Sequence, residues 1–306
     1  MRQFPLQTAP SQGLSLKRER LNILSAALFL TPMILILGTF NIFPALYSLY
    51  LSLFDWNGMT PEKEFIGLTN YARLFLSSEF WNSFGVTIIY GTGITIAALA
   101  FGLFAAVLLN SRIMGEKIFR TLYFLPVITP SIAAGVVWVH IFDPSRGIIN
   151  LFLHTAGITG PHWLTSPSTA LLSVIIVGIW KRVGFNLVIY LAALQNIPRS
   201  YYETAALQGA SSAAKFRYIT LPLLRGSTFF LTVTSLIEAF QVFDLVYIMT
   251  NGGPMGSTDV MGYYLYRYGF RYYEVGYASS IAYVMFAILF IATLFQFKLS
   301  KEESRQ

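Results

Sequence analysis

Six apolar runs, separated by shorter polar stretches, dominate the pattern along the chain. A helix needs about 20 apolar residues to span the hydrocarbon core of a bilayer, and every run reaches that length. The pattern therefore predicts an all-α polytopic membrane protein with six transmembrane helices. The runs are Ile23–Leu51, Phe84–Leu109, Ile118–Ile141, Thr169–Leu194, Ser227–Met249 and Gly276–Phe297.

Prolines interrupt two of these runs, at Pro32 and Pro44 in the first and at Pro126 and Pro130 in the third. Membrane helices tolerate proline better than soluble helices do, so both runs are still interpreted as spans. The first run is too long for a signal-peptide core, and no A-x-A cleavage pattern follows it. We therefore expect it to be a retained helix.

The distribution of basic residues predicts the orientation in the membrane. Fourteen of the 21 lysines and arginines lie on one side: four in the N-terminal tail, three between the second and third runs, four between the fourth and fifth, and three in the C-terminal tail. The opposite loops hold five basic and seven acidic residues. Because cytoplasmic loops carry the excess of Lys and Arg, both termini are predicted to be cytoplasmic, as in a multi-pass protein of the bacterial inner membrane.

The composition supports a membrane protein and excludes several other classes. Charged residues make up 11% of the 306 residues and hydrophobic ones 55%, whereas a soluble domain carries about 25% charge. The net charge of +7 fits basic cytoplasmic loops and membrane lipid, so no nucleic-acid partner is implied. The chain has no cysteine, which excludes disulfides, thiolate metal sites and cysteine nucleophiles.

The predicted organisation has one membrane domain between two short tails. Residues 1–22 form the N-terminal tail, residues 23–297 the six-helix domain, and residues 298–306 the C-terminal tail. Two loops on the predicted outer side, Phe54–Ser83 and Phe142–Ser168, are long enough to form small caps.

The segment 197–224, between the fourth and fifth runs, predicts an elbow of two short helices. Pro198 suits the first turn of a helix over Ser200–Gln208, and Gly209 permits the left-handed conformation that ends it. Ser211 or Ser212 can then cap a second helix over 213–219, before Pro222 kinks the entry into the fifth run. On this pattern alone, an interfacial helix that only anchors the loop is an equal alternative.

The elbow resembles the EAA loop of bacterial ABC importer permeases, whose pattern is E-A-A-x3-G-x9-I-x-L-P. The matching residues keep the spacing throughout, with Thr204 in place of the middle alanine and Gln208 in place of an aspartate. FRTLYFLPVITP (residues 119–130) and TNGGP (residues 250–254) resemble the carbohydrate branch, the maltose and glycerol-3-phosphate permease type, and the likeness covers about residues 22 to 298. The matching elbow residues are Glu203, Thr204, Ala205, Gly209, Ala210, Ile219, Leu221 and Pro222.

The resemblance implies a transport subunit without catalysis of its own, working by alternating access. Its elbow would dock on one of two cytoplasmic ABC ATPase subunits, and a second permease, expected to be a different chain, would complete the pathway. An extracytoplasmic solute-binding protein would deliver a sugar, a glucosylated polyol or a glycerol-phosphate-like solute. The chain lacks the G-x4-G-K-[ST] phosphate loop, so the partner ATPases would bind ATP and Mg.

Three ionisable residues, Lys181, Arg182 and Glu238, interrupt the fourth and fifth runs. Residues 181 and 238 each lie about twelve residues from the outer end of their run, so a rise of about 1.5 Å per residue places both near the bilayer midplane. An ionisable group there costs at least about 2.5 kcal/mol and normally faces a partner or a cavity. We expect Glu238 to pair with Lys181 or Arg182, or the three to line a polar cavity; the alternative is a buried pair that only fixes helix register.

The resemblance places solute contacts at the midpoints of these two runs. Aligned from the elbow, the contact positions include Ser235, which keeps the family's residue type, and Phe185, which keeps an aromatic ring. Asn186 and Gln241 are further candidates. The predicted solute pathway comprises Lys181, Arg182, Phe185, Asn186, Ser235, Glu238, Ala239, Gln241 and Val242.

A loop after the fifth run is the remaining candidate site. In the family this loop faces the binding protein, which implies that role for Asn251, Gly252, Gly253 and Pro254, although the glycines also suit a plain turn. Asp244 is a candidate to bind this loop. No metal site is predicted, because the three histidines lack ligand spacing on any one helix. An ion-coupled carrier and a polytopic membrane enzyme are the alternative functions.

Overall fold

A computed structural model describes residue 25 and residues 27–111 and 115–303. The predicted N-terminal tail, residues 1–22, and the end of the C-terminal tail, 304–306, lie outside the described residues. Four helices are long and apolar enough to cross a membrane, and two further pairs of helices, each bent at a short break, bring the number to six. The described residues are thus those of a multi-pass helical membrane protein, as predicted.

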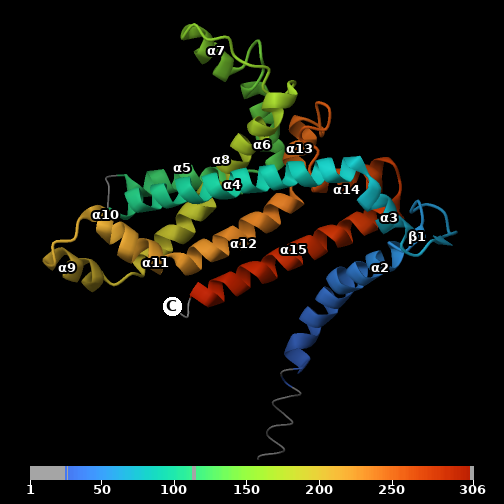
Figure 1. Ribbon diagram of the computed structural model, residues 1–306, viewed down its shortest axis with the longest axis horizontal. Helices are drawn as coiled ribbons and strands as arrows, with labels where there is room; N and C mark the ends of the chain where they lie inside the picture. Colours follow the sequence, from blue (N-terminus) through green and yellow to red (C-terminus); the bar gives the residue numbers. More distant parts are fainter. Residues whose placement is uncertain (1–24, 26, 112–114, 304–306) are drawn as a thin grey trace, which may run out of the picture.

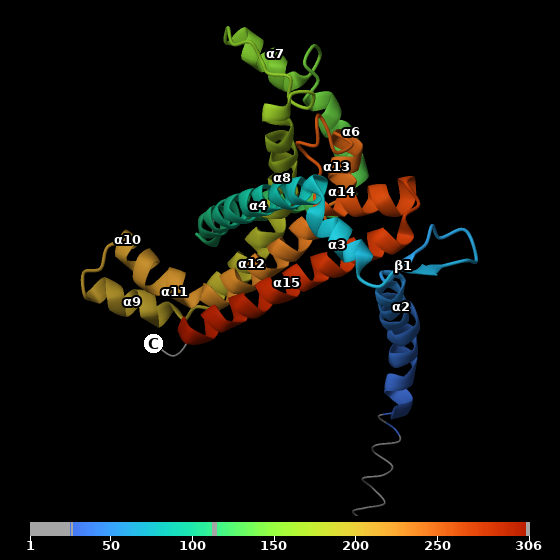
Figure 2. The same cartoon turned by 45° about the vertical axis from the view of Figure 1, so that its right-hand side comes forward.

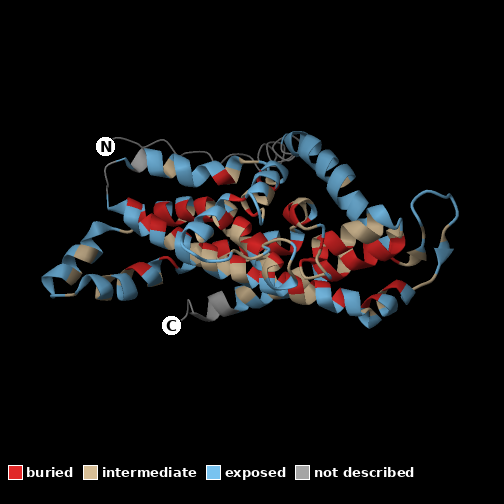
Figure 3. Cartoon of the chain, turned by 90° about the horizontal axis from the view of Figure 1, so that it is seen from above, coloured by how far each residue is buried: buried red, intermediate tan, exposed pale blue. Residues whose placement is uncertain are grey.

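The first span, Ala27–Leu51, includes a π-helical turn, η1 (Gly38–Ile42), and α2 (Phe43–Leu51). It points away from the other spans in both Figure 1 and Figure 2, and nearly all of its side chains are exposed (Figure 3). A loop then leads to α3 (Thr69–Leu76). Two strands of two residues each, β1 (Phe54–Asp55) and β2 (Glu64–Phe65), pair antiparallel in this loop, and this small ladder leaves the predicted all-α class unchanged.

Two long helices, α4 (Ser78–Asn110) and α8 (Pro167–Gln195), pack closely together and form the centre of the bundle. The Ser77 hydroxyl caps α4 by accepting from the Phe80 N–H at 3.3 Å. Glycines allow the two backbones to approach. A Cβ on Gly102 would lie 2.6 Å from the Asn186 Cβ, and one on Gly178 would lie 2.3 Å from the Ile94 Cδ1. This glycine-lined contact between α4 and α8 has no room for larger side chains.

The third span consists of α5 (Glu116–Ile128) and α6 (Ser131–Ile141), which meet at an angle of 102°. Pro126 lies inside α5 without ending it, whereas Pro130 immediately precedes α6 and marks the bend. Both prolines interrupt the apolar run, and the helix breaks only at the second. A short helix, α7 (Ile148–Thr155), follows in the predicted cap before α8.

The elbow leads from α8 into the fifth span. It comprises α9 (Arg199–Leu207), α10 (Ser212–Lys215), a π-helical turn η2 (Phe216–Thr220) and α11 (Leu221–Leu223). The segment Ser212–Leu223 then meets α12 (Arg225–Gln241) at 62°, so the chain bends at Leu224, two residues after the predicted position Pro222. In Figure 1 the elbow lies at the opposite end of the molecule from β1.

The fifth apolar run is not one helix, which corrects the predicted span Ser227–Met249. Helix α12 ends at Gln241, and α13 (Asp244–Met249) begins after two residues. Val242 adopts an extended backbone, and the backbone of Gly262 packs so closely on the Val242 carbonyl that a Cβ there would lie 2.3 Å from the oxygen. After α14 (Met261–Tyr266) and the π-helical turn η3 (Arg267–Arg271), α15 (Val275–Glu303) forms the last span.

Candidate functional site

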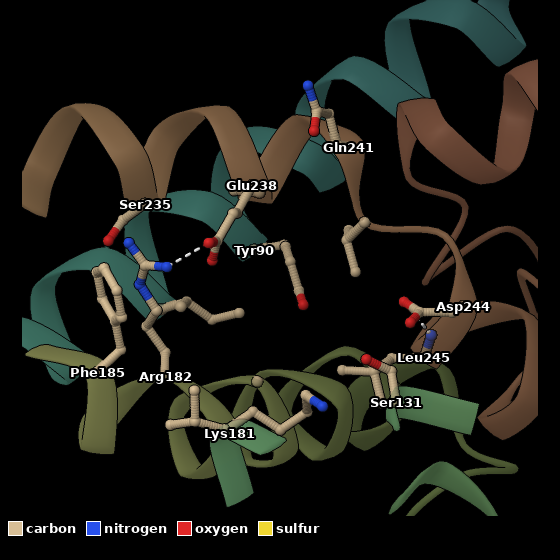
Figure 4. A pocket seen from close by; sticks show the side chains of 15 residues that line it. Tyr90, Ser131, Lys181, Arg182, Phe185, Ser235, Glu238, Gln241, Asp244 and Leu245 are labelled. Atoms are coloured by element: carbon tan, nitrogen blue, oxygen red, sulfur yellow. Dashed lines mark hydrogen bonds and ion pairs between the residues drawn. The ribbon is translucent and has the colours of Figure 1, made fainter. Parts of the chain in front are cut away.

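A cavity of about 400 Å³ lies where α8 and α12 meet the breaks in the third and fifth runs. Figure 4 shows its charged and hydroxyl side chains pointing inward from several helices. Eight of the nine predicted pathway residues line it: Lys181, Arg182, Phe185, Ser235, Glu238, Ala239, Gln241 and Val242. Counting residues had placed residues 181 and 238 at one depth, and the resemblance had supplied most of the other positions; the contact of these residues with a solute stays a prediction.

Arg182 and Glu238 form the predicted ion pair across the cavity wall. The Arg182 guanidinium also donates to the Thr234 hydroxyl at 2.7 Å, and it lies over the Phe185 ring at 4.6 Å from its centroid. Arg182 is buried and Glu238 is exposed to the cavity side. The pair thus joins α8 to α12, and it leaves a carboxylate at the surface of the cavity that can accept hydrogen bonds.

Among the residues that the structure describes, Lys181 pairs with no acid; its ammonium donates to the Thr129 carbonyl oxygen at 2.7 Å. Thr129 follows the last residue of α5, where the helix carbonyls lose their usual partners. A cation is favourable at this negative end of the helix dipole.

Asn186, the ninth predicted residue, does not line the cavity. Its side chain is fully buried against Gly102 of α4, and neither amide atom has a hydrogen-bond partner among the described residues. Phe185 faces the cavity, and successive residues of a helix point about 100° apart, so the next side chain turns away from it.

Unpartnered polar atoms at the cavity wall identify where a polar solute or water can bind. Within the described part of the chain, the Ser235 hydroxyl and the Arg182 Nε are buried without a hydrogen-bond partner, although both residues line the cavity. Buried polar groups are nearly always satisfied, so such atoms call for a ligand or an ordered water.

Three polar residues of the cavity, Tyr90, Ser131 and Asp244, were not among the predicted pathway residues. Tyr90 and Ser131 are uncharged, and the apolar runs around them gave no signal. The expected contact between Asp244 and the loop at Asn251 is wrong: Asp244 accepts from the Leu245 N–H at 3.0 Å and faces the cavity. The Asn251 side chain instead accepts from the Tyr263 hydroxyl at 2.8 Å and from Arg271 at 3.0 Å.

The elbow has the predicted local structure. Gly209 ends α9 in the left-handed region, with φ of +77°, and the Ala210 N–H donates to the Ala205 carbonyl at 2.9 Å. The Ser211 hydroxyl caps α10 by accepting from the Ala214 N–H at 3.2 Å. Tyr202 and Thr220 share a hydrogen bond of 2.9 Å, which ties α9 to η2. These bonds make the elbow one rigid unit.

The outer surface of the elbow is free in this chain. Thr204 and Leu221 are exposed, and Glu203 is exposed with no hydrogen bond or ion pair among the described residues. Leu207, which the sequence pattern did not single out, is 90% exposed. Both the Glu203 carboxylate and the Leu207 side chain are thus left uncovered by the described residues.

The loop at residues 250–254 is a tightly bonded turn. Thr258 donates to the Gly253 carbonyl at 2.8 Å and shares a hydrogen bond of 2.7 Å with Thr250. Asn251 has a positive φ of 53° and its side chain is bonded to Tyr263 of α14 and Arg271 beyond it, whereas the following Gly252 packs on the Tyr263 ring. The turn interpretation is therefore correct as structure, and the binding-protein role stays a prediction.

An ion-pair cluster holds this loop region on α4. Arg267 lies 2.9 Å from Asp259 and 3.1 Å from Glu79, the second residue of α4. Burial raises the pKa of the Asp259 carboxyl to about 6, although the charge of Arg267 acts in the opposite direction. Among the described residues, no group of three His, Cys, Asp or Glu could hold a metal ion.

Helix breaks at a charged cavity within a membrane bundle are the architecture of a solute permease, in which the ends of discontinuous helices surround the binding site. Comparison with known proteins agrees. Residues 98–302 match the family model of binding-protein-dependent transport system inner membrane components. The chain belongs to this family of ABC importer permeases.

Curated relatives align over nearly the whole chain. The probable ABC transporter permease protein YurN of Bacillus subtilis (strain 168) is 36% identical, over 90% of this chain and 97% of its own length. The sn-glycerol-3-phosphate transport system permease protein UgpA of Escherichia coli O157:H7 is 33% identical, over 91% and 94%. The trehalose/maltose transport system permease protein MalF of Thermococcus litoralis is 31% identical, over 90% and 92%.

A solved structure has the same fold. A chain of the bacterial alginate ABC transporter, in complex with an alginate pentasaccharide-bound periplasmic protein, superposes with a TM-score of 0.81 over 97% of this chain and 99% of that one. The two sequences are 22% identical, so this likeness concerns the fold alone.

Proposed function

We propose that this chain is a transmembrane permease subunit of an ATP-driven, binding-protein-dependent ABC importer for a sugar, a glucosylated polyol or a glycerol-phosphate-like solute. The observation that carries the proposal is the cavity, which lies between breaks in two spans and exposes hydroxyl, amide and charged groups. An aromatic ring, Phe185, beside hydrogen-bonding groups suits a hydroxyl-rich solute.

The charged residues that line the cavity are relevant to which solute it binds. Lys181 and Arg182 are offset by Glu238 and Asp244, so the wall contributed by this chain is close to neutral. The Ser235 hydroxyl and the Arg182 Nε remain free to bind polar atoms. Relatives named for trehalose and maltose and for glycerol 3-phosphate define the range of solutes to test.

The proposed partners are inferred from two features: the chain lacks a nucleotide-binding loop, and the surface of its elbow is exposed. It has no phosphate loop, so two ABC ATPase subunits would bind ATP and Mg and hydrolyse the nucleotide, and this chain would have no catalysis of its own. The rigid elbow, with Glu203 and Leu207 exposed, would dock on one ATPase. A second permease, a different chain, would complete the pathway, and an extracytoplasmic binding protein would deliver the solute to the side that carries residues 250–254.

The orientation follows from the charge distribution. The elbow and both termini would face the cytoplasm of a bacterial cell, because the basic residues concentrate on that side. Alternating access would then be driven from the cytoplasm through the elbow, as a rigid-body movement of the helices attached to it.

Uptake in proteoliposomes that contain the complete transporter and its binding protein tests the proposal. We expect maltose, trehalose or glycerol 3-phosphate to compete with the transported solute, and uptake to require ATP and to survive collapse of ion gradients by ionophores. Glu203→Lys should abolish uptake, because it reverses the charge of the surface proposed to dock on the ATPase. The amount of chain in the membrane should not fall, because Glu203 has no partner within the described residues. Uptake that follows an ion gradient without ATP would refute the proposal.

A further inference from the structure

The ammonium of Lys181 is already bound to the protein. It donates to the carbonyl of Thr129, the residue at which α5 ends and the chain turns through 102° into α6. The bond therefore caps the end of a broken helix from the side of α8, and it is a polar contact that holds the bend against that helix.

A second contact, about one turn further along α8, is made with α5, the same half of the bent span. The backbone of α5 approaches Gly184 so closely that a Cβ there would lie 1.9 Å from the Tyr123 carbonyl oxygen. Residues three apart lie on the same face of a helix, so Lys181 and Gly184 contact the same side of α5.

Beyond the bend, α6 packs mainly on α13, where a Cβ on Gly135 would lie 2.1 Å from the Ile248 side chain. It also meets α8 through the Trp138 and Trp180 rings, whose centroids lie 5.6 Å apart. The bend thus separates a half held by α8 from a half held mainly by α13.

The residue after Lys181 joins α8 to α12. Arg182 pairs with Glu238 and donates to Thr234, both on α12. The elbow joins the C-terminal end of α8 to the N-terminal end of α12. The two helices are thus linked at two places, through the elbow and through the contacts of Arg182. A displacement of the elbow is therefore carried along α8 to Lys181.

From these contacts we propose that Lys181 is a positioning residue that transmits movement of the elbow to the bend between α5 and α6, and does not serve as a solute ligand. This inference rests on the proposed function, because it assumes that nucleotide binding by an ATPase partner moves the elbow. The two adjacent cations therefore have different roles. Arg182 holds α8 and α12 together, and Lys181 couples the bend between α5 and α6 to the movement of these helices.

The absence of cysteine in the chain allows a direct test. Ser131, the first residue of α6, lines the cavity just beyond the bend, so Ser131→Cys gives this chain a single reactive thiol there. The complete transporter, co-purified with its ATPase subunits, is treated with a membrane-impermeant maleimide, both without nucleotide and after trapping with ATP and vanadate. Labelling is read on this chain alone.

With Lys181 intact, we expect the labelling rate to change severalfold on trapping. Lys181→Met should remove that nucleotide dependence, and Lys181→Arg, which can still donate to Thr129, should restore it. The matched control is Lys63→Met, a lysine in the loop before α3 whose ammonium lies among Tyr47, Tyr50 and Trp56; it should respond as the parent does.

ATP hydrolysis in the same preparations shows that each complex has assembled, and Lys181→Gln replaces Lys181→Met if the latter does not assemble. Nucleotide-dependent labelling that persists in both neutral variants would overturn the transmitting role. Unchanged labelling on trapping in the Ser131→Cys protein with Lys181 intact, in a complex that hydrolyses ATP, would overturn the inference alone. A complex that shows no ATP-dependent uptake would instead count against the proposed function.

Discussion

Arg182 and Glu238 form an ion pair whose two members are buried to very different extents: the arginine side chain is 9% exposed and the glutamate 61%. Removal of either residue breaks the same contact, but the group left behind differs. A guanidinium left alone is surrounded by protein, whereas a carboxylate left alone faces the open side of the cavity. The pair is therefore asymmetric in its contribution to stability.

This asymmetry predicts that Glu238→Leu is more destabilising than Arg182→Leu. Loss of the partner of a buried charge costs about 3 kcal/mol or more, and loss of the partner of an exposed one costs about 1 kcal/mol. Thermal unfolding of the detergent-solubilised protein, followed by size-exclusion chromatography, measures both. In the double variant neither charge remains, so its midpoint should lie above that of Glu238→Leu. Equal midpoints for the two single variants would contradict the asymmetry.

Gly184→Ala should prevent α5 from packing closely on α8. The added Cβ would lie 1.9 Å from the Tyr123 carbonyl oxygen, and a backbone atom cannot move aside as a flexible side chain can. Overpacking of this kind costs about 1–3 kcal/mol or more. Gly226→Ala, near the start of α12, is the control, because nothing lies within 4 Å of its Cβ position. The thermal midpoint should fall only for Gly184→Ala.

At Gly209 the limit on substitution is set by the backbone. Its φ of +77° is unfavourable for most side chains, yet nothing lies within 4 Å of a Cβ there. Asparagine tolerates the left-handed region and valine does not. Gly209→Asn should therefore retain most ATP-driven uptake, and Gly209→Val should lose it. If both variants transported equally well, the conformation of the elbow would not matter for coupling.

The cluster of Asp259, Arg267 and Glu79 predicts that acid strengthens the docking of residues 250–260 on α4. The pKa of Asp259 is about 6 in the folded loop and 3.8 as the reference value, so between these values the docked loop holds a proton that the open loop has lost. The stability of docking therefore rises as the pH falls from 7 to 5, the reverse of the usual behaviour of a paired carboxylate.

Hydrogen exchange at the Met261 amide, which donates to the Thr87 hydroxyl at 2.8 Å, reports this docking. After correction for the intrinsic exchange rate, protection should increase from pH 7 to pH 5 in the parent protein. Asp259→Asn removes the titrating group and should make protection independent of pH over this range. A parent protein whose protection falls in acid would show that ion pairing outweighs burial at Asp259.

The sequence predicted the charged cavity well because the relevant information is local. Lys181 and Glu238 lie at equal depth in two neighbouring antiparallel spans, so counting residues was enough to bring the charged groups together. The elbow was equally accessible, since Gly209 and Ser211 mark its turn through backbone conformation and capping.

What the sequence could not reveal depends on contacts between distant segments. The break at Val242 has no proline or glycine to mark it; it coincides with the close approach of Gly262 from α14. Asp244 was misplaced for the same reason, because an unbroken span would have carried it toward the loop and away from the cavity. The two-residue strands β1 and β2 are likewise too short to produce a pattern.

The glycine-lined contact between α4 and α8 limits how the protein can change shape. Helices that touch through Gly102 and Gly178 have little spare volume between them, so sliding of one past the other would require clashes or voids. We therefore expect a change in access to the cavity to leave this pair as a single body. The expected joints are the bend at Thr129 and Pro130 and the break at Val242 and Phe243.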